Sequence, residues 1–166
     1  MNYFKLLQIE QKYNINLKDL EHHYLQSLNK FHPDRAKTEQ QKVEFLKYAI
    51  DINNAYNILK NEVKRAVYIL SLHNIDIENA EIKNKFPTHI LDRIWENFEY
   101  AEDTEEIETL NKFKNQKLEE KQNIILKITT ALAKKELQKA AQHTIELKYF
   151  TNIIDNINTK IKNVID

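Results

Sequence analysis

The chain has 166 residues, in which 25 Lys and Arg balance 25 Asp and Glu, and it contains no glycine, no cysteine and two prolines. This balance lacks the overall basic field that attracts nucleic acid, and without cysteine there are no disulfides, thiolate metal sites or thiol nucleophiles. Tight hairpin turns are costly without glycine, so an all-α protein is expected. No apolar run approaches the roughly 18 residues of a membrane-spanning helix, and neither nucleic acid nor a membrane is an expected partner.

The first predicted elements are a short helix over residues 2–9 and a longer helix over residues 17–31. Asn16 is a suitable N-cap for the longer helix, and Asp19 lies in its first turn, where the helix dipole favours an anion. Apolar residues then recur at spacings of three and four as far as Phe31, which is typical of an amphipathic helix. The polar residues between them predict a face that is open to water.

The tripeptide His32-Pro33-Asp34 ends this helix. Pro33 has no N–H and its ring clashes with the preceding turn, and it also pushes His32 out of the α region. The helix must therefore end near Phe31 and leave an imidazole and a carboxylate on a short loop at its tip. A rigid polar loop between two helices is more often a contact site than a catalytic one.

A third helix is predicted over residues 38–59, where Thr38 and Gln41 form a capping-box pattern. Because the loop before it is short, this helix should run antiparallel to the preceding one. Asn61 can cap a fourth helix that continues to Leu72. The N-terminal region is therefore expected to hold four helices with an antiparallel central pair.

The chain is predicted to divide into a first domain over residues 1–75, a linker over 76–87 and a second domain over 88–166. The linker region is polar, lacks helical periodicity and includes Pro87, as domain linkers often do.

A three-helix bundle is expected in the second domain. Thr88 can cap its first helix and Thr104 its second, and a break at residues 133–136 separates the second helix from the third. In the first of these helices acidic residues follow one side, with Trp95 beside them, an arrangement that suits an interface.

Residues 1–75 resemble a J domain, and the matching features are Tyr3-Phe4, the helix that ends at Phe31, the His32-Pro33-Asp34 loop, and Ile-Asn, Ala-Tyr and Leu within residues 52–59. More particularly, Asn2-Tyr3-Phe4 and the run from Arg65 to His73 are similar to the HscB-type J-domain co-chaperones of iron–sulfur cluster assembly. With the C-terminal helices, which are similar mainly in length and pattern, the resemblance covers nearly the whole chain.

This resemblance implies a protein that binds a DnaK/HscA-type ATPase chaperone through its J domain, delivers an IscU-like scaffold through its C-terminal helices, and stimulates ATP hydrolysis by the chaperone. It implies no enzyme activity, cofactor or metal site. By position, the chaperone-binding residues would be His32, Pro33, Asp34, Lys18, His22, Lys30 and Arg35. The client-binding residues would be Leu91, Trp95, Glu96, Glu99, Asp103 and Tyr149.

The chain departs from the family pattern at two places. Its second helix has His22 and His23 where the family usually carries more Lys or Arg. Asp92 stands where the family usually has an apolar residue, so no client contact is assigned to it. Because adjacent helical residues point about 100° apart, the two histidines do not predict a metal site.

Other interpretations remain open at this point. The chain could be a J-domain co-chaperone for a different client, or a helical interaction protein that oligomerises through its long C-terminal segments. We expect a monomer or weak self-association, and a bacterial cytoplasm or, alternatively, a mitochondrial matrix as its compartment. An enzyme is disfavoured because no catalytic set converges in the sequence.

Overall fold

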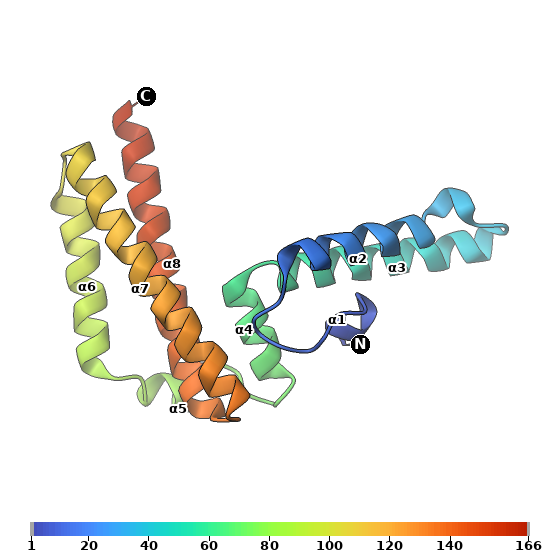
Figure 1. The fold of residues 1–166 in the computed structure, drawn as a ribbon, viewed down its shortest axis with the longest axis horizontal. Helices are drawn as coiled ribbons and strands as arrows, with labels where there is room; N and C mark the ends of the chain where they lie inside the picture. Colours follow the sequence, from blue (N-terminus) through green and yellow to red (C-terminus); the bar gives the residue numbers. More distant parts are fainter. Residues whose placement is uncertain (1, 166) are drawn as a thin grey trace. The chain divides into compact units, whose positions relative to one another are not determined.

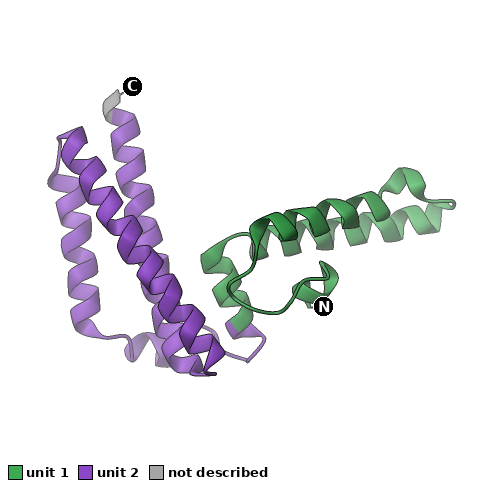
Figure 2. Ribbon diagram, in the orientation of Figure 1, with its two compact units in different colours: residues 1–69 green, residues 70–166 purple. Residues whose placement is uncertain are grey.

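The protein is all-α, as its composition predicts. A computed structural model describes residues 2–165, with side chains as far as residue 163. This part of the chain contains eight α-helices, one 3₁₀ helix and no strand. It forms two compact units, residues 1–69 and residues 70–166 (Figures 1 and 2). Within the described residues, no helix combines the length and apolarity that spanning a bilayer requires.

The first unit is built around an antiparallel pair of helices, α2 and α3, with α1 packed on α3 (Figure 1). The three predicted N-caps of this region are confirmed, because Asn16 accepts a hydrogen bond from the N–H of Lys18, Thr38 from that of Gln41 and Asn61 from that of Lys64. The buried core includes Phe4, Leu7, Leu20, Ile52 and Leu59. The helices of this region are α1 (Tyr3–Leu6), α2 (Leu17–Lys30), η1 (Pro33–Arg35), α3 (Glu39–Leu59) and α4 (Glu62–Ser71).

The second unit is a bundle in which α7 and α8 pack along each other and α6 packs against α8. The break between the two long helices falls where it was predicted, since α7 ends at Ala133 and α8 begins at Leu137. Its core includes Ile94, Leu110, Ile128, Leu147, Phe150 and Ile153. The helices are α5 (Ala80–Asn84), α6 (Thr88–Asp103), α7 (Ile107–Ala133) and α8 (Leu137–Ile165).

The segment 76–87, predicted as a linker, differs from that expectation. It belongs to the second unit, which begins at residue 70, and it contains the short helix α5. Ile77, Ile82 and Phe86 are buried, at 2%, 9% and 7% exposure. These apolar residues are too few and too irregularly spaced to form a periodic stripe. The sequence therefore gives no helical signal for a segment that tertiary contacts hold in place.

Two predicted N-caps are corrected. Pro87 occupies the N-cap of α6, which leaves Thr88 inside the helix. Thr104 ends α6 instead of starting α7, because its hydroxyl donates to the carbonyl of Tyr100 at 2.6 Å. A threonine hydroxyl can satisfy a free carbonyl at the end of one helix as readily as a free N–H at the start of the next.

Candidate interaction sites

The His32-Pro33-Asp34 loop lies at the tip of the α2–α3 pair. Helix α2 ends at Lys30, and the backbone of His32 is extended, with φ −68° and ψ 132°, as the following proline requires. His32 Nδ1 lies 3.3 Å from the backbone nitrogen of Asp34 and 3.5 Å from its carboxylate. The side chains are 56% and 87% exposed, so both polar groups are open to a partner.

An aromatic contact positions this loop. The ring of Phe31, directly before His32, stacks on Tyr48 of α3 at 4.6 Å and meets Phe45 edge-on at 5.6 Å. These contacts join the residue before the loop to the helix that follows it, and so hold the two ends of the loop together. Tyr48 is not among the predicted site residues, although its place three residues after Phe45 puts the two rings on one helix face.

The charged residues predicted around the loop are all exposed and all belong to the first unit. Lys18, His22 and Lys30 lie along α2, and Arg35 ends the 3₁₀ turn. His22 forms a hydrogen bond with Gln26 at 2.9 Å. Leu25 on the same helix is 56% exposed, and it lies outside the apolar stripe that runs to Phe31.

The predicted client residues occupy α6 and α8 of the second unit. Leu91 and Tyr149, from different helices, are both half-buried and line one cavity of about 220 Å³. Trp95 is 66% exposed, with its ring centre 6.5 Å from that of Phe98, so it presents a large apolar surface to solvent. The predicted acidic client residues Glu96, Glu99 and Asp103 are all exposed, and none of the three lines this cavity.

The second unit also buries a carboxylate, Glu146, that no sequence pattern marked. Glu146, with a side chain only 3% exposed, accepts a hydrogen bond from Arg93 at 2.9 Å. Burial alone would raise the pKa of Glu146, but the hydrogen bond with His143 and the positive charges of Lys127 and Arg93 lower it overall. These groups are paired within the bundle, which indicates a structural role.

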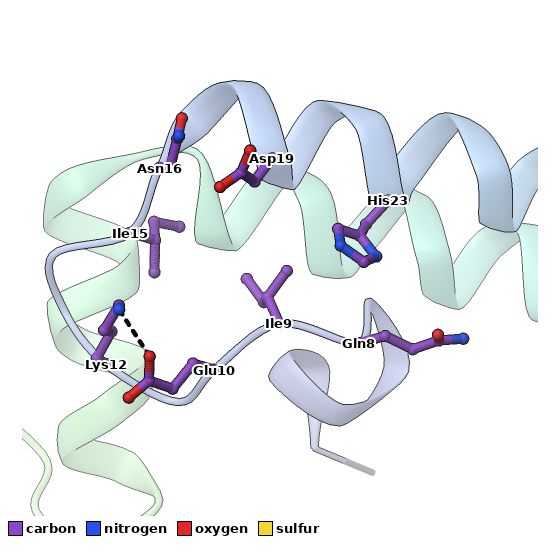
Figure 3. A pocket seen from close by; sticks show the side chains of 8 residues that line it. All are labelled: Gln8, Ile9, Glu10, Lys12, Ile15, Asn16, Asp19 and His23. Carbon is purple, nitrogen blue, oxygen red and sulfur yellow. Dashed lines mark hydrogen bonds and ion pairs between the residues drawn. The ribbon is translucent and has the colours of Figure 1, made fainter.

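A separate hollow of about 270 Å³ lies in the first unit, between α2 and the loop that precedes it (Figure 3). The side chains of Asp19 and His23 extend from α2 on the side of Ile9 (Figure 3). Within the loop, Nζ of Lys12 forms an ion pair with the carboxylate of Glu10 at 2.6 Å. None of the predicted chaperone-binding residues lines it. Among the residues that the structure describes, no three His, Asp or Glu side chains gather closely enough to hold a metal ion.

Two family models match the chain, one in each half. The DnaJ domain matches residues 2–68, and the HSCB C-terminal oligomerisation domain matches residues 87–158.

Individual co-chaperone proteins are also similar to this chain, over different lengths. The co-chaperone protein HscB of Buchnera aphidicola is 30% identical over 165 residues, which cover 93% of this chain and 92% of the relative. The HscB of Proteus mirabilis is 39% identical over 83 residues, which are 49% of this chain and span only 48% of that protein. Among solved structures, human co-chaperone protein HscB has a TM-score of 0.86 at 22% identity, over 96% of this chain and 82% of the human one.

Proposed function

Because this chain belongs to the HscB family of J-domain co-chaperones, we propose that it works beside an ATPase chaperone and is not itself an enzyme. It delivers an IscU-like scaffold protein of iron–sulfur cluster assembly to a DnaK/HscA-type chaperone and stimulates ATP hydrolysis there. The observation that carries the proposal is the exposed His32-Pro33-Asp34 loop at the tip of an antiparallel helix pair.

On the chaperone side, His32 and Asp34 supply polar groups to the ATPase domain, and Pro33 fixes the loop that presents them. The exposed cations steer the encounter and orient the docked J domain, because complementary charge at an interface acts mainly on association rate and register. These cations are Lys18, Lys30 and Arg35, with His22 beside them.

On the client side, Leu91, Trp95 and Tyr149 form the apolar contact. Trp95 is the principal anchor, since exposed tryptophans at interfaces often carry a large share of the binding energy. The acidic side of α6 faces basic residues of the scaffold, and its contributors are Glu96, Glu99 and Asp103.

The decisive test replaces one loop residue. We expect His32→Gln to reduce stimulation of the chaperone's ATPase to the basal rate, measured with an IscU-like scaffold in steady-state assays. Scaffold binding should persist, because the client residues lie on the other unit. The fold should also persist, since the imidazole is exposed.

The matched control is His89→Gln, which changes an exposed histidine of α6 outside the proposed sites. It should stimulate as the unchanged protein does. Full stimulation by His32→Gln would refute the role of the loop. Stimulation by the unchanged protein with no detectable complex with the scaffold would instead assign a different client.

A further inference from the structure

The cavity beside Leu91 and Tyr149 has an apolar floor that the segment before α6 helps to build. Ile77, Phe86 and Ile145 are buried beneath it, at 2%, 7% and 7% exposure. The ring centres of Phe86 and Tyr149 are 6.3 Å apart. The predicted linker is therefore a structural part of this site, because it supplies both Ile77 and Phe86.

Three charged side chains stand at the rim of this cavity. Glu78 forms two ion pairs: its Oε2 lies 2.5 Å from Nζ of Lys83, and its Oε1 lies 2.6 Å from Nζ of Lys148. All three side chains are about half exposed, at 50%, 52% and 47%. They join the segment before α6 to α8 across the mouth of the cavity.

The side chains that line the rim carry one net positive charge. Hydrogen bonds from Lys148 and Lys83 lower the pKa of Glu78 to about 2, so its carboxylate is ionised at neutral pH. Among the lining side chains, two ammonium groups thus share a single carboxylate. Each ammonium has three N–H donors and uses one on Glu78, which leaves donors available to a further acceptor. Asp76 also acts on Lys83, but more weakly, and does not line the cavity.

The size of the cavity restricts what fills it. Its volume of about 220 Å³ is below the roughly 300–1,000 Å³ typical of small-molecule sites. An apolar cavity of this size suits a single side chain of a partner protein. That partner is the client, since Leu91 and Tyr149 already belong to the proposed client surface.

We propose that Lys83 and Lys148 are specificity-determining residues of the client site, which select a client segment with an acidic residue next to the apolar side chain that enters the cavity. The proposal rests on the proposed function, because it assigns the cavity to the same client. Glu78 holds both lysines in place and competes with the client's carboxylate for them. The client surface then has two signs of charge, basic at the cavity and acidic along α6, which fixes the register of the bound segment.

The test asks whether each of three substitutions in the full chain raises or lowers the affinity for an IscU-like scaffold, measured by titration calorimetry at low salt. Lys83→Met and Lys148→Met keep most of the length of the side chain and remove the charge. Each should weaken binding by up to about fivefold, the range for an exposed ion pair. Glu78→Gln should strengthen binding, because it releases both lysines to the client.

Lys139→Met is the matched control, because Lys139 lies on α8 away from the cavity and has its own ion pair with Glu136 at 3.0 Å. It should bind as the unchanged protein does. Leu91→Ala reports on the client surface itself and should weaken binding. Thermal unfolding of every variant shows whether its fold is intact.

Opposite signs for the lysine and Glu78 variants would support the proposal. If the three variants all weaken binding, or all match Lys139→Met while Leu91→Ala weakens it, the rim is only structural and the inference fails while the proposed function stands. If the unchanged protein does not bind the scaffold, the proposed function fails and this inference falls with it.

Discussion

At the scale of single residues, the absence of glycine has a consequence at three helix ends. Gln8, Asn74 and Lys135 have positive φ angles of 55°, 58° and 57°. Each follows a helix that ends in a Schellman motif; after α7, the N–H of Glu136 bonds to the carbonyl of Ala131 at 2.8 Å. Asparagine tolerates this conformation better than the other two residues, because its short side chain can hydrogen-bond locally.

We predict that Lys135→Gly stabilises the protein. Glycine removes the strain of a side chain in the left-handed region, which stabilises the folded state by roughly 1–2 kcal/mol. It also increases the freedom of the unfolded chain, which lowers the unfolding free energy by up to about 1 kcal/mol. A net gain of about 0.5–1 kcal/mol is expected, measured as a rise in the urea midpoint of unfolding.

The neighbouring residue provides the control for this prediction. Lys134 has φ −84° and ψ 0°, in the right-handed region, so glycine relieves nothing there. Lys134→Gly should lower stability by about 0.5–1 kcal/mol. Equal effects of the two substitutions would contradict the assignment of strain to Lys135.

At the scale of elements, α7 buries Lys117, although lysine is a residue type that rarely lies in a protein core. The side chain of Lys117 is 4% exposed, and its ammonium lies 2.7 Å from Glu120 and 4.8 Å from the centre of the Phe113 ring. The ammonium also lies 5.8 Å from the centre of the Phe150 ring of α8. Its alkyl stem therefore fills core space between two helices, which is a packing role for a charged residue.

We predict that Lys117→Met leaves stability unchanged or raises it by up to about 1 kcal/mol. Methionine fills similar space against the two rings and removes the cost of burying an ammonium, while Glu120, at 29% exposure, remains accessible to water. Lys117→Ala should instead lower the unfolding free energy by about 2 kcal/mol, because it leaves a gap in the core. Urea unfolding measures both, and a methionine variant as unstable as the alanine variant would show that the charge matters more than the volume.

At the scale of the whole molecule, the two proposed sites lie on different compact units. Delivery of a client to the chaperone therefore depends on the covalent link, which raises the effective concentration of one site near the partner of the other.

We predict that fragments separate the two activities. Residues 1–75 alone should stimulate the chaperone's ATPase weakly and without further increase when scaffold is added, whereas residues 70–166 should bind scaffold without stimulating. An equimolar mixture of the fragments should not restore the rate of the intact chain in steady-state ATPase assays. A mixture as active as the intact chain would show that the link contributes nothing.

The features that the sequence predicted correctly depend on local backbone chemistry. Pro33 cannot continue the α-helix that precedes it, and the side chains of Asn16 and Thr38 cap the helices that follow them. The lack of glycine and the spacing of apolar residues indicated helices throughout, and these preferences need no knowledge of distant contacts. The position and exposure of the loop followed from the same reasoning.

Tertiary structure alone decided which side chains meet across the chain. Segment 76–87 looked like a linker, yet contacts with α8 make Ile77 and Phe86 part of a cavity. Burial of Lys117, and the pairing of Glu78 with Lys148 seventy residues away, likewise leave no periodic mark in the sequence. Local propensity fixes where a helix begins and ends, but the environment of a side chain depends on residues that only folding brings together.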